Sequence, residues 1–94
     1  MTNKQIIGIL LEISGLLELK KENTFKIRAY RRLAQFLEGF DRELADIYRE
    51  KGKAGLVELP NIGEGIAKKI VELLDTGKLA YLDELKKSLP ETRE

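Results

Sequence analysis

At residues 59–65 the chain reads LPNIGEG, a turn sequence that stands directly before the amphipathic stretch 66–76. Glycine adopts left-handed backbone angles freely and Asn tolerates them, so Asn61 and Gly63 permit a turn whose N–H groups point outward together. Gly65 leaves the approach to these groups open, and the N-terminus of the following helix adds its positive dipole end. We therefore predict a helix-hairpin-helix motif that binds a phosphate backbone at Asn61, Gly63 and Gly65.

The inner side of this hairpin is apolar. We expect Ile62 to be buried between two helices, with a following core face centred on Ile66, Ala67, Ile70, Leu73 and Leu74. Lys68 points away from that face, whereas Lys69 lies at its edge, where partial desolvation favours a neutral, nucleophilic amine. A helix corner without any ligand is the alternative, because Gly and Pro mark many turns. A GxGxxG nucleotide loop fits poorly, since no strand precedes the turn.

Around the hairpin the sequence predicts helices and no strand. Thr2 and Gln5 form a capping box before a helix at 4–19, whose wide apolar surface indicates burial on more than one side. Thr24 is predicted to cap a second helix at 25–38, and Asp41 a third helix that stops at Gly52. A short helical turn at 54–58 and a helix at 66–76 follow. The last predicted helix contains Leu79, Leu82 and Leu85 and ends before Pro90. We expect an all-α fold, a compact bundle of about five helices with one helix-hairpin-helix motif.

Length and composition limit the possible functions. The 94 residues, 43% hydrophobic and 35% charged, are typical of one globular domain, which we place at 1–90, with 91–94 as a tail or a boundary with a longer protein. Without Cys or His the chain lacks disulfides, a Cys-based zinc site and the commonest general base, so any catalysis must use Lys, Tyr, Asp or Glu. The sequence contains no membrane span and no signal peptide. We expect a monomer that is not secreted and that is located in the cytoplasm of a prokaryote or in the nucleus.

Positive charge is concentrated in residues 20–37, although the net charge is only +1. One acid, Glu22, stands there against six bases: Lys20, Lys21, Lys26, Arg28, Arg31 and Arg32. This pattern indicates a local anion site, and a solvated helix face is the alternative. The buried face of this helix is predicted to hold Phe25, Tyr30, Leu33, Phe36, Leu37 and Phe40. Lys26 falls within that face, and either has a function there or extends from the helix end to water. Tyr30 is alternatively a core residue with its hydroxyl at the surface.

Two motifs together resemble the amino-terminal domain of family X DNA polymerases, the DNA polymerase beta group. One is the hairpin with Ile66-Ala67-Lys68-Lys69-Ile70 and Thr76-Gly77-Lys78-Leu79. The other runs from Asn23 to Phe25 and continues as Arg28-Ala29-Tyr30-Arg31-Arg32. The resemblance covers about Thr2 to Pro90. Many DNA repair and recombination proteins share the hairpin, and the second motif makes the match more specific.

The resemblance implies a DNA-binding domain, not specific for base sequence, that binds near the 5′-phosphate of a gapped duplex. Because the chain is too short to be a polymerase on its own, we expect a domain or fragment of one, attached to a C-terminal polymerase domain in the full-length protein, or else a stand-alone relative. Some members also act as a 5′-deoxyribose-phosphate lyase in base excision repair, through a Schiff base. By resemblance Lys69 would form the Schiff base, and Lys26 and Tyr30 would assist. Additional phosphate contacts are expected from Lys68, Arg28, Arg31 and Arg32.

No cofactor is required, but the resemblance implies a monovalent cation, K⁺ or Na⁺, on the carbonyls of Val57, Leu59 and Ile62. The chain departs from the family at several positions. Two phosphate-binding lysines fall on Gly65 and Tyr81, a histidine falls on Phe25, and the first hairpin glycine falls on Asn61. These departures affect the expected lyase activity more than DNA binding. Two alternatives remain: DNA binding without catalysis, and a helical protein-interaction module whose basic second helix meets an acidic partner.

Overall fold

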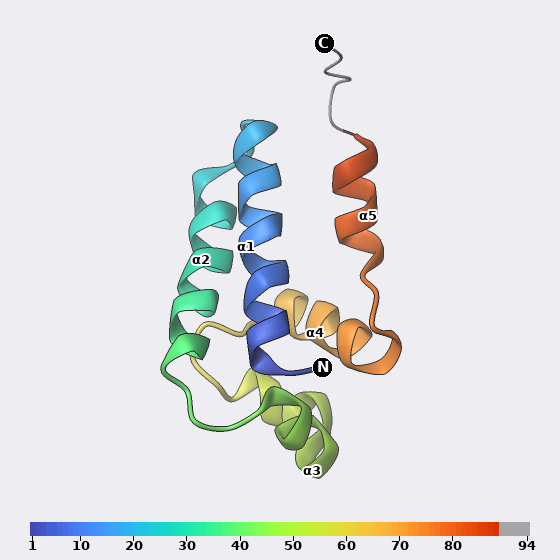
Figure 1. Cartoon of the computed structure of the whole chain (residues 1–94). Helices are drawn as coiled ribbons and strands as arrows, with labels where there is room; N and C mark the ends of the chain where they lie inside the picture. Colours follow the sequence, from blue (N-terminus) through green and yellow to red (C-terminus); the bar gives the residue numbers. More distant parts are fainter. Residues whose placement is uncertain (89–94) are drawn as a thin grey trace.

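The computed structural model describes residues 1–88, which form five helices and no strand (Figure 1). In chain order they are α1 (Asn3–Leu19), α2 (Thr24–Glu38), α3 (Leu44–Val57), α4 (Glu64–Thr76) and α5 (Ala80–Lys87). The predicted all-α fold with a helix-hairpin-helix motif is confirmed. The domain limit at residue 90 and the tail at 91–94 lie outside the described residues. None of the described helices is long and apolar enough to cross a membrane.

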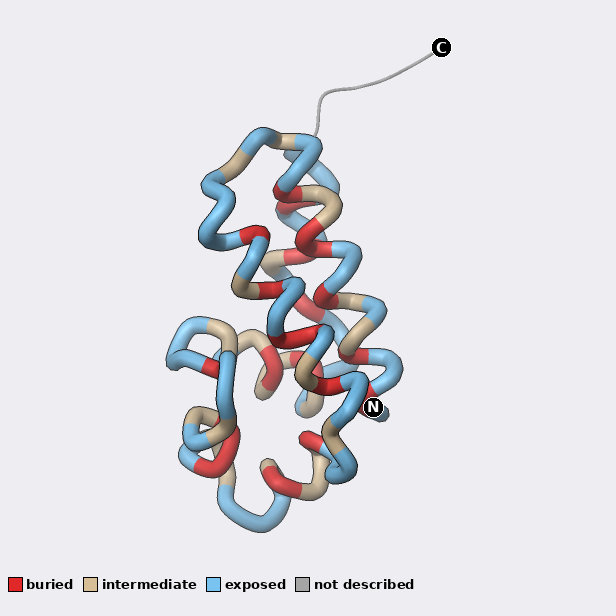
Figure 2. The backbone as a smooth tube through the Cα atoms, turned by 90° about the vertical axis from the view of Figure 1, so that its left-hand side faces the viewer, coloured by how far each residue is buried: buried red, intermediate tan, exposed pale blue. Residues whose placement is uncertain are grey.

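Helix α1 occupies the middle of the fold. It packs extensively against α2 and also contacts α5, and Figure 1 shows it between these two helices. Its buried side chains recur every three to four residues: Ile6, Leu10, Ile13 and Leu17. Figure 2 shows the same alternation of buried and exposed positions along the helices. The buried side chains form one stripe, flanked by the partly buried Ile7, Ile9 and Leu16, while Leu11 and Leu19 on the other side are exposed. Helix α1 is therefore buried along one broad face, and the predicted burial on more than one side was wrong.

Local caps define the starts of the first two helices. The predicted capping box of α1 is present, because the Gln5 N–H donates to Thr2 Oγ1 (3.2 Å) and the Thr2 N–H donates to Gln5 Oε1 (2.8 Å). For α2 the predicted cap was wrong by one residue. Asn23 is the N-cap, since its Oδ1 accepts from the Phe25 N–H at 2.7 Å, and Thr24 is already the first helical residue. An Asn cap serves the same orphan donors as a Thr cap.

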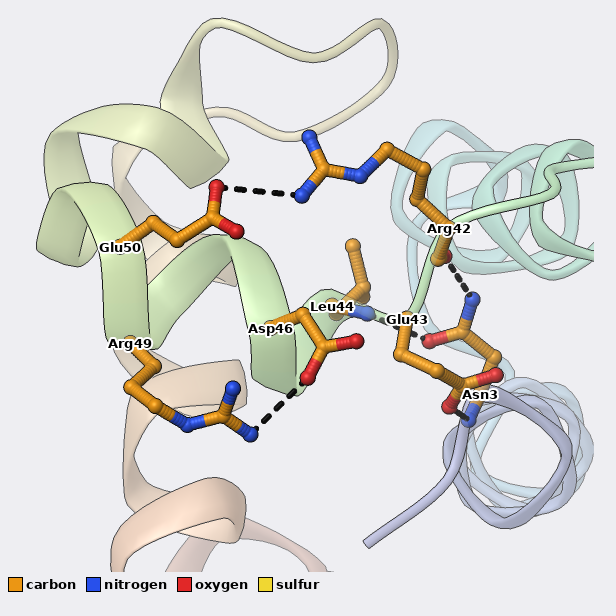
Figure 3. A network of polar contacts seen from close by, with 7 residues as sticks. All are labelled: Asn3, Arg42, Glu43, Leu44, Asp46, Arg49 and Glu50. Carbon is orange, nitrogen blue, oxygen red and sulfur yellow. Dashed lines mark hydrogen bonds and ion pairs between the residues drawn. The ribbon is translucent and has the colours of Figure 1, made fainter.

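The start of α3 is capped from another helix (Figure 3). The predicted cap at Asp41 was wrong: the N-cap is Glu43, and its side chain makes no cap bond. Instead, the buried side chain of Asn3 accepts from the Leu44 N–H through Oδ1 (2.8 Å) and donates to the Arg42 carbonyl (2.6 Å). Glu43 Oε1 in turn accepts from the Asn3 N–H at 2.8 Å. Helices α1 and α3 thus satisfy each other's terminal backbone groups.

Two glycines end helical segments. Gly52 has φ 70° and ψ −164°, which breaks α3 into the predicted helix and the predicted short turn that follows it. Gly77 has φ 78° and donates its N–H to the Leu73 carbonyl at 2.8 Å, closing α4 with a left-handed residue as predicted. Helix α4 begins at Glu64, two residues earlier than predicted.

The buried face of α2 differs from the prediction at its first turn. Phe25 is 77% exposed, whereas the face consists of Ile27, Tyr30, Leu33, Ala34 and Leu37. At ~100° per residue, Phe25 projects to the side opposite this face, so the predicted burial of Phe25 was wrong. Lys26 projects toward the core side yet is exposed, because a long side chain in the first turn can reach water. The predicted exposure of Arg28, Arg31 and Arg32 is confirmed.

Candidate nucleic-acid interface

The hairpin between α3 and α4 turns at Asn61, whose φ is 68°. Gly63 has φ −88° and ψ −177°, an extended conformation open to any residue, so the left-handed position is Asn61 alone and not Gly63. Ile62 between them is 4% exposed and is anchored in the core, as predicted. The Ile62 N–H donates to the Leu59 carbonyl at 3.4 Å, which closes the turn.

The start of α4 presents backbone donors without a side-chain cap. Its first backbone bond runs from the Ala67 N–H to the Gly63 carbonyl (2.8 Å), so the N–H groups of residues 64–66 have no partner within the helix. Gly63 is the N-cap and has no side chain to offer them. A Cβ at Gly63 or Gly65 would meet no atom within 4 Å, so the approach is open. Such a helix end can bind a phosphate group.

An ion pair lies next to these donors. Lys53 Nζ contacts Glu64 Oε2 at 2.6 Å, and Glu64 stands in the first turn of α4. The hydrogen bond and charge of Lys53, followed by the charge of Lys68, lower the pKa of Glu64. Lys53 was missed by the sequence analysis, because eleven residues separate it from Glu64 and only the fold of α3 onto α4 brings the two together. The two lysines balance the carboxylate and leave one positive charge beside the exposed N–H groups.

The three residues expected to take part in catalysis lie around a fourth, Tyr81 of α5. Lys69 Nζ is 4.5 Å from the centroid of the Tyr81 ring. The rings of Tyr30 and Tyr81 are stacked, with centroids 6.3 Å apart and an interplanar angle of 21°. Lys26 and Tyr81 line one pocket at the surface. Side chains from α2, α4 and α5 thus form the lysine–tyrosine cluster, defined as Lys26, Tyr30, Lys69 and Tyr81.

Burial perturbs two members of this cluster. The pKa of Lys69 is lowered, first by burial and then by the positive charge of Lys26, with Glu72 opposing both. Burial, together with the neighbouring Tyr81, raises the pKa of Tyr30, so its hydroxyl keeps its proton over the physiological range. Lys69 is half-buried, as expected for a lysine at the edge of the apolar stripe. The cluster therefore combines an amine that loses its proton more easily than usual with a neutral phenol.

The bases of segment 20–37 line two neighbouring depressions. Lys20 and Lys26 line the pocket next to Tyr81, and Lys20 Nζ donates to Ser88 Oγ at 2.7 Å. Arg28 and Arg31 line a separate depression formed by residues at the α1–α2 turn and on both helices, where Arg31 pairs with Glu18 at 2.8 Å. Five of the six bases thus line these two depressions, which share Glu22, and among the six only Lys26 is close enough to Lys69 to lower its pKa.

The carbonyls proposed as cation ligands lie on both sides of the turn. Val57 ends α3, where carbonyl groups have no intrahelical partner, and the Leu59 carbonyl accepts the long bond from Ile62. Backbone carbonyls are suitable ligands for a hard cation. Within residues 1–88 no three His, Cys, Asp or Glu side chains are grouped to hold a metal ion. The monovalent cation at the carbonyls of Val57, Leu59 and Ile62 stays a prediction.

Comparisons with known proteins agree with this geometry. The profile of the helix-hairpin-helix domain family matches residues 1–79. The chain is 37% identical over 91 residues, 97% of its length, to DNA polymerase/3'-5' exonuclease PolX of Bacillus subtilis (strain 168). It is 37% identical over 82 residues, 87% of its length, to DNA polymerase IV of Saccharomyces cerevisiae. These matches span 15% and 13% of the two relatives, and they confirm the resemblance to the N-terminal domain of family X DNA polymerases.

Proposed function

The chain belongs to the helix-hairpin-helix domain family, and on that premise we propose that it binds DNA through the phosphate backbone without reading base sequence. One observation carries the proposal: the uncapped N-terminus of α4 behind the left-handed Asn61, open at Gly63 and Gly65. Backbone N–H groups recognise phosphate and contact no base edge, so they position DNA without specifying its sequence. Lys53 and Lys68 add charge at the same end of α4.

We further propose that the DNA bound is the 5′-phosphate side of a gap, and that the chain serves as the first domain of a longer, polymerase-type protein. The support is the likeness to two DNA polymerases of which the chain spans only 15% and 13%. Within the chain, the lysine–tyrosine cluster offers two lysines near the surface, a suitable surrounding for a terminal phosphate.

The lyase activity is the chemical part of the proposal. The neutral amine of Lys69 attacks C1′ of the open-chain aldehyde at a 5′-deoxyribose phosphate, and water leaves as the iminium forms. The iminium acidifies C2′, which loses a proton, and the C3′–O bond breaks, so that the DNA departs with a 5′-phosphate. Hydrolysis then returns Lys69. Burial and Lys26, which lower the pKa of Lys69, increase the neutral amine available for the first step.

A monovalent cation at the hairpin belongs to the same proposal. The carbonyls of Val57, Leu59 and Ile62 would hold K⁺ or Na⁺. Such an ion supplies positive charge beside the phosphate that the N–H groups of α4 bind. The protein's own part is to keep these three carbonyls on one tight turn, which the buried side chain of Ile62 anchors.

Binding is tested by fluorescence anisotropy on three DNAs: a gapped duplex with a 5′-phosphate, the same gap with a 5′-hydroxyl, and an intact duplex. We expect the phosphorylated gap to bind most tightly, with affinity that falls steeply with salt, at a slope that corresponds to roughly three to five phosphates. Two gapped DNAs of different sequence should bind alike. A flat salt response, or strong preference for one sequence, would contradict the proposal.

The lyase is tested by borohydride trapping on a duplex with a 5′-deoxyribose phosphate. We expect a covalent protein–DNA adduct, formed slowly because Gly65 and Tyr81 stand where the family has phosphate-binding lysines. The matched control is the same duplex with a reduced, tetrahydrofuran-type abasic site, which has no aldehyde and cannot form an imine. An equal yield from both DNAs, or none from either, would refute the lyase and leave DNA binding as the function.

A protein-interaction module is the second candidate. Phe25 at 77% and Leu19 at 70% are the most exposed large apolar side chains among the described residues, and Arg28 follows Phe25 on α2. An aromatic side chain beside an arginine is typical of protein-binding surfaces. If the basic second helix serves an acidic protein partner, Phe25→Ala should abolish capture of that partner while affinity for gapped DNA stays within about twofold. Loss of DNA affinity in Phe25→Ala would instead assign the residue to DNA.

A further inference from the structure

Lys69 is held by an aromatic ring and not by a carboxylate. Its Nζ lies over the face of Tyr81, and it forms no ion pair with any acid of residues 1–88. The acid that acts on it, Glu72, is occupied elsewhere, because its Oε2 accepts from the Ala80 N–H at the start of α5 (2.9 Å). Among the described residues, the contact with Lys69 Nζ that the structure shows is therefore the Tyr81 ring.

The ring and the rest of the surroundings act on Lys69 in opposite directions. An ammonium over a ring face is attracted by the ring's quadrupole, whereas a neutral amine is not, so Tyr81 favours the charged form. Burial and the charge of Lys26 favour the neutral form. The groups that act on Lys69 are thus Lys26 from α2, Glu72 from α4 itself and Tyr81 from α5.

The position of Tyr81 is itself determined by packing. Its ring is stacked on Tyr30, which is almost fully buried. The next residue, Leu82, is buried, as is Leu85 one turn further along α5, and α5 contacts α1. The ring cannot move away from Lys69 unless α5 shifts or the stack with Tyr30 opens.

We propose that Tyr81 is a positioning residue for Lys69. The Tyr81 ring holds the ammonium of Lys69 between α4 and α5 until a ligand displaces it. The inference rests on the proposed function, in which Lys69 is the nucleophile. In the free protein Lys69 then acts as a cation that attracts the terminal phosphate. When the sugar takes the place of the ring contact, the ammonium releases its proton to water and the amine becomes available for attack.

The test is NMR of the protein after reductive ¹³C-methylation of its lysines, with Lys69→Arg used to identify the Lys69 signal. In the native protein the Lys69 methyl signal should be shifted upfield by the Tyr81 ring current. The shift should persist in Tyr81→Phe and vanish in Tyr81→Leu. The pKa of Lys69 should fall by about 0.5 in Tyr81→Leu and stay near its native value in Tyr81→Phe.

Two results would overturn the proposal. Absence of the upfield shift in the native protein would show that the lysine does not lie over the ring. An unchanged or raised pKa in Tyr81→Leu would show that Tyr81 merely shields Lys69 from water. Tyr81→Met is the second non-aromatic variant should Tyr81→Leu fail to fold, with circular dichroism as the check.

Borohydride trapping on the same variants separates the two proposals. If the native protein forms no adduct, the lyase is refuted, and the NMR result still decides whether Tyr81 positions Lys69. If it does form one, the pH of half-maximal trapping at subsaturating DNA, which reports the free protein, should fall by the same ~0.5 in Tyr81→Leu as the pKa of Lys69. A pH profile identical to that of the native protein would contradict the positioning role.

Discussion

The hairpin and the lysine–tyrosine cluster share helix α4, yet they are built from different parts of the chain. The hairpin site consists of backbone N–H groups, exposed because Gly63 and Gly65 carry no side chains. The cluster consists of side chains brought together from three helices. A substitution that places a larger side chain over the backbone N–H groups should impair the hairpin site. A substitution that truncates a side chain should impair the cluster. The difference predicts that binding and chemistry can be impaired separately.

The largest expected effect is on the cluster. Lys69→Ala should remove most of the borohydride trapping, because Lys69 is the proposed nucleophile and lies over the Tyr81 ring, while intact-duplex affinity stays within about twofold. Ala is a good helix former, so α4 should persist. In the native protein the trapping rate should rise with pH and level off below the pKa of an ordinary lysine, since the pKa of Lys69 is lowered.

The matched control for this prediction is Lys68→Ala, one residue away on the exposed side of α4. It should weaken DNA binding slightly and leave trapping at saturating DNA unchanged. Equal trapping by Lys69→Ala and the native protein would show that another amine reacts and would remove Lys69 from the chemistry.

The reverse pattern is expected at the hairpin. Gly63→Val should lower the affinity for gapped DNA by about tenfold or more, or about 1.4 kcal/mol, because the isopropyl group stands beside the uncapped N–H groups. The fold should survive, since Gly63 has negative φ and no atom lies within 4 Å of its would-be Cβ. Anisotropy measures the affinity, and thermal unfolding checks the fold.

Gly8→Val is the control for Gly63→Val, because Gly8 also has open space around it but lies on α1, away from the hairpin. It should leave DNA affinity unchanged. If a folded Gly63→Val protein binds gapped DNA as tightly as the native chain, the hairpin is not the phosphate site.

A smaller effect, on stability, is expected at Asn61. Asn61→Val should lower the free energy of unfolding by about 1–2 kcal/mol, because a β-branched residue resists the φ of 68° found there. Asn61→Gly should be close to neutral, since glycine adopts this conformation freely. Urea denaturation of the three proteins measures the effect. Equal loss in both variants would indicate that the Asn side chain matters and its backbone conformation does not.

The smallest effect concerns the charges beside the hairpin. Lys53→Met removes one cation and leaves Glu64 unpaired at the start of α4, so the log–log salt slope of DNA binding should decrease by about one. Lys51→Met, on an exposed lysine two residues earlier, is the control and should leave the slope unchanged. Identical slopes for the two variants would place Lys53 outside the interface.

Three residues behave differently in the structure from what their residue types suggest, and for a related reason. Phe25 was assigned to the buried face of its helix, and the packing of α2 instead buries Ile27. Asp41 was assigned as a cap from its residue type, but α1 supplies Asn3 for that purpose. Gly63 was assigned the left-handed conformation that Asn61 adopts. In each case the residue type is compatible with several positions or backbone conformations. A residue distant in sequence, or the local backbone of the turn, determines which one is adopted.

By itself the sequence determined the five helices, the buried Ile62 and the glycine-rich opening before α4, because periodicity, caps and turn residues act over a few neighbouring positions. It also placed Lys69 at the edge of the apolar stripe, since that depends on the helical period alone. Only the tertiary structure decided that Lys53 meets Glu64 and that Tyr81 lies under Lys69. Those contacts join different helices, so their geometry depends on how whole helices pack, which no short stretch of sequence specifies.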